Sequence, residues 1–335
     1  MSDTKESLVY CGGAEALATL GQIQPKGDLP DQNPCPLGGC LRNFAAAAVL
    51  LLLGWERPAT ASDRFTTNSR LVLVPVTVTD RNGKTVSGLQ REHFQVMEDA
   101  QSREILSLTR EEGAMGLGMV LDLSGSMRHK TGPAQSAARA VASGTGAGDE
   151  IFLMTFADHT GMRVPMTRDR EWIAAGLTGL RAGGNTALID AIYRALAEVR
   201  ASSHRRKALV LISDGGDNAS RYSEAELKRW AQESDAQIYS ISIVEGVRNQ
   251  AAWRGADMLD DLAEITGGLH FTIRDHRELP AVAERLARAM KEVYVIAYKP
   301  GEAQPGKWRK VRVSVTSESS KNLRVTARSG YYLPE

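Results

Sequence analysis

Five residues with oxygen-bearing side chains stand at places where the sequence changes from apolar to polar. They are Asp122, Ser124, Ser126, Thr186 and Asp214. Carboxylates and hydroxyls, without sulfur or imidazole, are the ligands of hard divalent cations such as Mg²⁺, Mn²⁺ or Ca²⁺. The residue types therefore predict a metal site, provided that the fold brings the five side chains together.

Each part of this set also has an ordinary structural explanation. The run from Asp122 to Ser126 suits a strand end followed by a Ser/Gly turn, Thr186 suits a helix N-cap, and Asp214 with two following glycines suits a turn. The metal interpretation needs all three segments at one edge of a sheet. In open α/β sheets, ligands bind at the carboxyl ends of the strands.

The elements that would position these residues alternate between strands and helices from Gly116 onward. Strands are predicted at 117–123, 150–156, 162–166, 208–212, 238–244 and 269–273, and helices at 133–142, 169–180, 186–199, 222–233, 258–265 and 279–293. This order predicts an α/β fold with a doubly wound, mostly parallel sheet flanked by helices.

The segments on either side of this region alternate between apolar and polar residues, as half-buried strands do. Leu71–Thr79 is one such strand, an Asn-Gly hairpin signal follows at residues 82–83, and residues 94–97 and 105–108 are two more. Pro75 cannot donate to a strand ladder, which predicts an edge strand or a bulge. After the last helix, strands are predicted at 294–298, 308–316, 323–327 and 330–332.

A few strands with one apolar face are stable only when that face is covered. We therefore expect the β segments 64–112 and 294–335 to pair as one small sandwich, with the α/β domain 113–293 inserted between them. An independent β unit on each flank is the alternative.

Residues 1–61 are predicted to be a leader with a signal peptide, disordered or cleaved. Residues 44–55 form an apolar run after Arg42, and residues 59–61 read Ala-Thr-Ala, a small-residue cleavage signal. We expect export to the periplasm or the cell exterior. The alternative is an uncleaved signal that anchors the chain through residues 44–55, although this run is shorter than the ~20 residues that span a bilayer.

Composition excludes some functions and leaves others open. The 41 basic and 40 acidic residues nearly balance, so there is no electrostatic case for nucleic-acid binding. Cys11, Cys35 and Cys40 all precede the apolar run, so the remainder of the chain has neither a disulfide framework nor a thiolate metal site.

The combined motif resembles the metal-ion-dependent adhesion site of von Willebrand factor type A domains. The resemblance covers about residues 113–293 and rests on D-x-S-x-S at 122–126, G-G-N-T at 183–186 and D-G at 214–215, with a G-D pair at 148–149. The whole chain is similar to bacterial, acidobacterial-type von Willebrand-related proteins through residues 71–80, 94–99 and 328–332.

The resemblance implies a role for each of the five residues. Ser124 and Ser126 would coordinate a Mg²⁺-type ion through their hydroxyls, and Thr186 would do so directly or through water. Asp122 and Asp214 would hold metal-bound waters. This arrangement leaves the ion short of direct negative charge, so that an open position accepts a carboxylate from a protein partner.

The resulting expectation is a secreted or periplasmic adhesion or scaffold module that is not an enzyme and has no catalytic residues. Phosphoryl transfer with Asp122 as nucleophile is one alternative, although Ser124 replaces the second acid of such phosphatases. A structural domain with a vacant metal site is another. Serine hydrolysis lacks support, because His129, His159 and His204 lie in polar turns without an evident nucleophile. Asp217 is expected either to add charge near the ion or to act as a turn or helix-cap residue.

Overall fold

In the computed structural model, residues 8–10, 71–245, 250–302, 306–316 and 322–333 are described. All of them belong to one compact unit formed by residues 1–14 and 68–335, whereas a second unit, residues 15–67, lies outside these ranges. The predicted signal peptide, its cleavage site and the three cysteines therefore also lie outside the described residues. No helix within the described ranges is long and apolar enough to span a membrane.

A six-stranded sheet carries the candidate site. Its strands are β6 (Met115–Asp122), β7 (Glu150–Phe156), β8 (Thr160–Thr167), β9 (Arg206–Ser213), β10 (Gln237–Ile243) and β11 (His270–Ile273). The strand order is β11-β10-β9-β6-β7-β8, and all pairs are parallel except β7 with β8. Because β6 lies between β7 and β9, the chain reverses its direction of strand addition there, and ligands bind at such switch points.

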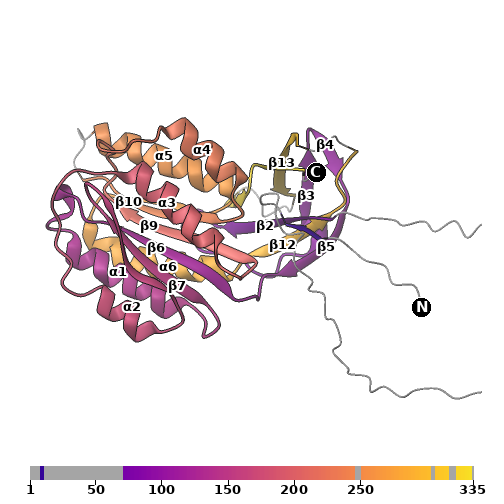
Figure 1. Cartoon of the computed structure of the whole chain (residues 1–335). Coiled ribbons are helices and arrows are strands. Elements are labelled where there is room, and N and C mark those ends of the chain that lie inside the picture. Colours follow the sequence, from indigo (N-terminus) through magenta and orange to yellow (C-terminus); the bar gives the residue numbers. More distant parts are fainter. Residues whose placement is uncertain (1–7, 11–70, 246–249, 303–305, 317–321, 334–335) are drawn as a thin grey trace, which may run out of the picture. The chain divides into compact units, whose positions relative to one another are not determined.

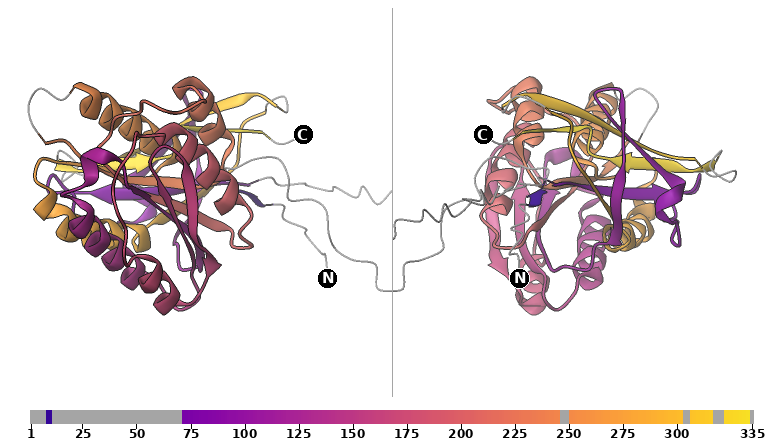
Figure 2. Two further views of the ribbon diagram at one scale, coloured as in Figure 1. Left: turned by 60° about the vertical axis from the view of Figure 1, so that its left-hand side comes forward. Right: turned by 90° about the vertical axis from the view of Figure 1, so that its right-hand side faces the viewer.

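Helices cover both faces of this sheet (Figures 1 and 2). One face packs on α1 (Thr131–Gly144), α2 (Arg170–Gly176) and α6 (Leu279–Lys291), and the other on α3 (Leu188–Arg200), α4 (Glu224–Glu233) and α5 (Gln250–Thr266). Alternating residues of β6 serve the two cores: Met119 and Leu121 face α1 and α6, whereas Val120 faces α3. The predicted fold class is confirmed.

The β strands outside this domain form two further sheets. One contains β1 (Leu8–Tyr10), β2 (Leu71–Thr79), β5 (Ile105–Arg110), β12 (Tyr294–Tyr298) and β14 (Arg324–Ala327); the other contains β3 (Phe94–Glu98), β4 (Gln101–Arg103), β13 (Trp308–Val315) and β15 (Gly330–Tyr332). β2 pairs antiparallel with β12, and β3 with β13. Strands that precede and follow the α/β domain therefore share both sheets and bury one core between them. Three short 3₁₀ turns complete the described elements: η1 (Arg91–His93), η2 (Gly125–Met127) and η3 (His276–Glu278).

One expectation for the β segments is wrong. Pro75 lies in an interior strand without a bulge: β12 pairs with one side of β2, while β1 pairs with residues 71–73 and β14 with residues 76–79 on the other. Pro75 falls in the gap between β1 and β14, so the missing N–H removes no ladder bond on that side. Residues 8–10, which belong to the predicted leader, form strand β1 parallel to β2.

Helix ends differ from the predicted ones for local reasons. Asp169 caps α2 by accepting from Glu171 N and Trp172 N, and α2 ends at Gly176 instead of residue 180. α5 begins at Gln250, eight residues before the prediction, and includes Gly255. A Cβ on Gly255 would lie 1.3 Å from the carbonyl oxygen of Gly215, so this glycine permits the helix to approach the loop that follows β9.

Candidate metal centre

Backbone hydrogen bonds join the three loops that carry the predicted ligands. The loop after β6 contacts the segment before α3 twice: Gly183 N donates to Leu123 O at 2.8 Å, and Gly125 N donates to Gly184 O at 3.0 Å. The loop after β9 joins them, because Asn218 N donates to Thr186 O at 3.0 Å. The Asn218 side-chain oxygen in turn accepts from Thr186 N at 2.8 Å.

These contacts bring all five predicted residues to the carboxyl edge of the sheet. We call Asp122, Ser124, Ser126, Thr186 and Asp214 the oxygen cluster. β6 and β9 are neighbouring parallel strands, with Leu121 opposite Ile212, so Asp122 and Asp214 leave the sheet side by side.

Asp122 is the most buried acid of the cluster, with no solvent exposure. Its Oδ1 accepts from Ser124 N at 2.8 Å, and its Oδ2 accepts from the Ser213 hydroxyl at 2.6 Å. Burial raises the pKa of the Asp122 carboxyl, and the hydrogen bonds from Ser124 and Ser213 act in the opposite direction. A cation beside this carboxylate would relieve the cost of burying its charge.

The hydroxyl groups connect Asp122 with Asp214. Ser124 Oγ lies 3.1 Å from Ser126 Oγ, and Ser126 Oγ donates to Asp214 Oδ1 at 2.8 Å. Adjacent ligands of an octahedral Mg²⁺ lie about 2.9 Å apart, since each Mg–O bond is about 2.0–2.1 Å. The two serine oxygens therefore have the spacing of two neighbouring ligands of one such ion. The donor set, all oxygen, fits a hard cation.

Thr186 is buried and makes its hydrogen bonds through the backbone. The N-cap of α3 is Ala187, and no side-chain cap bond forms there. Instead, Asp217 Oδ1 accepts from Ile189 N at 3.2 Å and from the Ser220 hydroxyl at 2.5 Å. The N-cap explanation for Thr186 is wrong, and Asp217 has the cap role that was one of its two expected roles.

Two side chains outside the predicted set contact the cluster. Lys130 is 5% exposed, and its Nζ donates to Asp214 Oδ2 at 2.7 Å. Ser213 supplies the hydroxyl that Asp122 accepts. Lys130 stands four residues after Ser126, immediately before α1, and a basic residue so close to the motif is the signal in the sequence that could have found it. Ser213 stands opposite Asp122 once β6 and β9 are paired, which the sequence alone does not establish.

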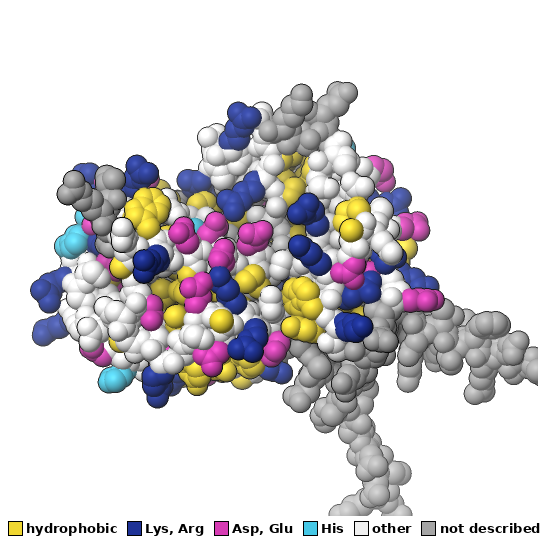
Figure 3. Space-filling model, turned by 90° about the horizontal axis from the view of Figure 1, so that it is seen from above, with side chains coloured by type: hydrophobic (Ala, Val, Ile, Leu, Met, Phe, Trp, Pro, Cys, Tyr) yellow, Lys and Arg dark blue, Asp and Glu magenta, His cyan; other side chains and the backbone are white. Residues whose placement is uncertain are grey.

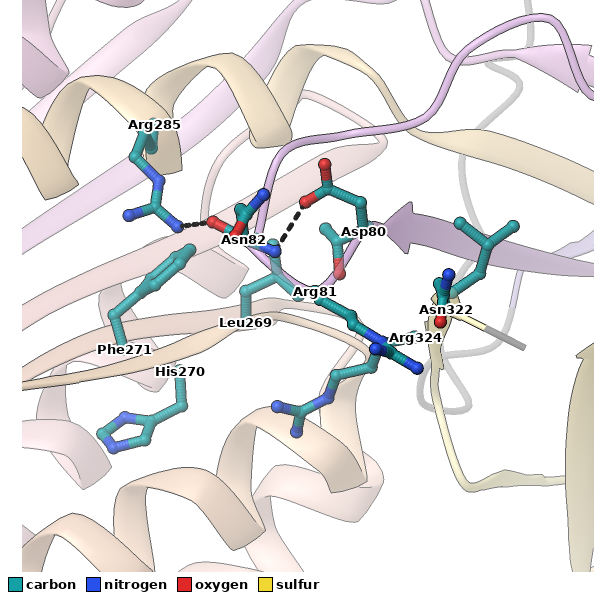
Figure 4. A pocket seen from close by; sticks show the side chains of 12 residues that line it. Asp80, Arg81, Asn82, Leu269, His270, Phe271, Arg285, Asn322 and Arg324 are labelled. Carbon is teal, nitrogen blue, oxygen red and sulfur yellow. Dashed lines mark hydrogen bonds between the residues drawn. The ribbon is translucent and has the colours of Figure 1, made fainter. Parts of the chain in front are cut away.

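A different pocket, of about 430 Å³, is lined by basic side chains and by none of the predicted ligands. Arg81, Arg285 and Arg324 line it, together with the Asn82 turn and Phe271 (Figure 4). The Arg285 guanidinium donates to Asn82 O and lies 5.3 Å from the centre of the Phe271 ring. On the face of the molecule shown in Figure 3, basic and acidic side chains are interspersed, in keeping with the balanced charge.

Comparison with known families identifies the domain that carries the cluster. Residues 117–216 match the family model of the von Willebrand factor type A domain. The chain contains a von Willebrand factor type A domain. The matched residues run from β6 to the loop after β9 and include the whole oxygen cluster. Domains of this type are generally protein-interaction modules.

Individual relatives of this chain are distant. An uncharacterized protein of Borreliella burgdorferi is 27% identical over 145 residues, which is 38% of this chain and 42% of that protein. The chain thus matches less than half of that relative's length.

Solved structures are also similar to the chain. A von Willebrand factor type A protein from Catenulispora acidiphila has a TM-score of 0.45 at 14% identity, covering 81% of this chain and 76% of that one. The von Willebrand factor domain of the type V pili tip protein Mfa5 from Porphyromonas gingivalis has a TM-score of 0.45 at 12% identity, covering 57% and 98%.

Proposed function

We propose that this chain is an exported adhesion or scaffold module that binds an acidic group of a protein partner through a Mg²⁺-type ion at the oxygen cluster. One observation carries the proposal. Two serine hydroxyls 3.1 Å apart lie between two carboxylates on loops that the backbone joins at the edge of the sheet.

The residues of the cluster divide into ligands and supports. Ser124, Ser126 and Thr186 offer hydroxyl oxygens, which neutralise little of a cation's charge. Asp122 is fixed by Ser124 N and the Ser213 hydroxyl, and it adds negative charge on the buried side of the cluster. These hydroxyls would hold a Mg²⁺-type ion without supplying direct negative charge, which a carboxylate of the partner would then provide.

Lys130 limits the negative charge of the site before a partner arrives. Its ammonium group pairs with Asp214 in a buried position, so one of the two acids of the cluster is already compensated. A partner that brings its own carboxylate therefore completes the charge balance of the site. Acidic partners are therefore favoured over neutral ones.

The burial and hydrogen bonding of Asp122 disfavour a role for it as a phosphoryl acceptor. A nucleophilic carboxylate needs a free oxygen that reaches the substrate, yet Asp122 has no exposed surface and both of its oxygens accept hydrogen bonds. The proposal of export rests on the apolar run at residues 44–55 and its following small residues.

Partner capture tests the proposed function. Full-length protein is incubated with envelope extract of its own cells in Mg²⁺, then washed with or without EDTA. We expect a protein that the wild type retains in Mg²⁺, releases in EDTA, and that Ser126→Ala does not retain. The proposed function would be contradicted if Ser126→Ala retained the same proteins as the wild type and if the EDTA wash released none of them. Hydrolysis of a generic phosphate ester that Asp122→Asn abolishes would support the enzyme instead.

A further inference from the structure

A second group of metal-ligating side chains lies on the same edge of the sheet. His129 follows η2, Glu245 follows β10, and His276 begins η3 after β11. Because β6, β10 and β11 run parallel, the segments after them emerge at one edge. We call these three residues the histidine cluster.

The three side chains already face one another. Glu245 uses one carboxylate oxygen for each imidazole: Oε2 lies 3.0 Å from His129 Nε2, and Oε1 lies 2.5 Å from His276 Nδ1. One ligand atom from each residue lies within 4.8 Å of the other two. We propose that the histidine cluster binds a Zn²⁺-class transition-metal ion through two imidazole nitrogens and one carboxylate.

The distances suit such an ion. Zinc–nitrogen and zinc–oxygen bonds are about 2.0–2.2 Å, so two ligand atoms of a tetrahedral zinc ion lie about 3.4 Å apart. The two hydrogen-bonded distances in the cluster, 2.5 and 3.0 Å, are shorter than this value, and one ligand atom from each residue lies within 4.8 Å of the other two, so a small outward movement of the side chains would admit the ion. The His129 side chain is 62% exposed and has room to adjust. Water would fill the fourth position on this exposed side.

The histidine cluster and the oxygen cluster select different metals. Imidazole suits Zn²⁺, Ni²⁺ and Cu²⁺, whereas Mg²⁺ takes oxygen ligands. Lys130 lies between the two clusters, 2.7 Å from Asp214 Oδ2 and 3.7 Å from Glu245 Oε2. Its buried ammonium group separates the two carboxylates, so a single ion does not share them. The zinc proposal therefore does not depend on the proposed function.

Zinc titration of the full-length chain tests the inference. The protein carries no affinity tag, and Cys11, Cys35 and Cys40 are replaced by serine so that thiolates do not bind the metal. Calorimetry should give one Zn²⁺ per chain. His129→Ala and His276→Ala should each weaken this binding at least tenfold, and Co²⁺ should report the site through its visible absorption.

Control variants make each outcome decisive. His159→Ala, an exposed histidine outside the cluster, should bind zinc like the parent chain. Glu245→Gln keeps the shape of the side chain and should also weaken binding, and melting curves verify that each variant is folded. The proposal is wrong if the parent chain binds no zinc. It is also wrong if His129→Ala and His276→Ala bind zinc as tightly as the parent chain does, because the cluster is then only a group of ion pairs. Ser126→Ala should keep zinc binding, so failure at one cluster is distinguishable from failure at the other.

Discussion

Replacing Glu98 by alanine should destabilise the β-sandwich more than any exposed substitution. Glu98 is fully buried, yet it accepts hydrogen bonds from donors on several strands. These donors are Tyr331 Oη at 2.6 Å, Arg309 Nη2 at 2.7 Å, Arg103 Nε at 2.9 Å, Gly301 N at 2.9 Å and Tyr298 Oη at 3.2 Å. Its removal takes away one of the two acids that pair with the buried Arg309 guanidinium, the other being Asp99 Oδ2 at 2.8 Å, and it deprives two buried tyrosine hydroxyls of this acceptor.

The expected cost follows from that geometry. Removing one partner of a buried ion pair costs about 3–5 kcal/mol, because the other charge stays out of water. With an unfolding entropy of about 2.1 cal/mol/K per residue, that loss corresponds to a fall in melting temperature of about 4–9 °C for a protein of this size. Urea unfolding followed by circular dichroism measures the free energy. Glu104→Ala, on an exposed residue of the same segment, is the matched control and should change it by less than about 0.5 kcal/mol.

The same carboxylate predicts a dependence on pH. Burial would raise the pKa of Glu98, but the hydrogen bonds from Tyr331, Gly301 and Arg309 outweigh burial and leave it below the ordinary value of 4.5. The stabilisation should therefore be fully present above pH 4.5 and be lost as the pH falls through the lower, native pKa. Glu98→Gln should lose less stability over that acid range than the wild type. A cost below about 1 kcal/mol for Glu98→Ala would refute the buried-pair argument.

Three further outcomes follow from the structure. Burial lowers the pKa of His270 from 6.5 to about 4. The free energy of unfolding should therefore fall by up to about 3 kcal/mol as the pH drops from 6.5 to 4. Urea unfolding of His270→Gln should not show this dependence on pH. Asp217→Ala should cost about 1 kcal/mol through the lost cap of α3 while Mg²⁺ binding by calorimetry persists; loss of Mg²⁺ binding would assign Asp217 to the metal site. Residues 64–112 expressed alone should show no cooperative melting, because β2 and β3 pair with strands after residue 293; a cooperative transition would argue for independent β units.

The sequence was informative where a local pattern determines the structure. β2, β7 and β12 have the predicted bounds or contain the predicted ranges, because alternating or continuous apolar runs end abruptly at polar turns. The candidate ligands could be found for the same reason, since Asp122 and Asp214 mark the ends of such runs. The local residue pattern predicts both the strand and the loop that follows it.

Contacts between distant segments could not be predicted in this way. Lys130 and Ser213 join the site only because β6 lies beside β9, an order set by packing across the whole sheet. His129 looked like an ordinary turn residue because its partners, Glu245 and His276, follow strands more than a hundred residues later. The residue pattern along the chain does not show which of these distant segments lie next to each other in space.

Thermal melting with and without Mg²⁺ tests the central claim most directly. An ion that binds only the folded state stabilises it by about 2.7 kcal/mol at a hundredfold excess over its dissociation constant. Wild-type protein freed of metal by EDTA should therefore melt at a higher temperature once Mg²⁺ is restored. Ser126→Ala should lose this increase, and Ser102→Ala in β4 should keep it. An unchanged melting temperature in the wild type, or an equal increase in Ser126→Ala, would contradict a metal site at the oxygen cluster.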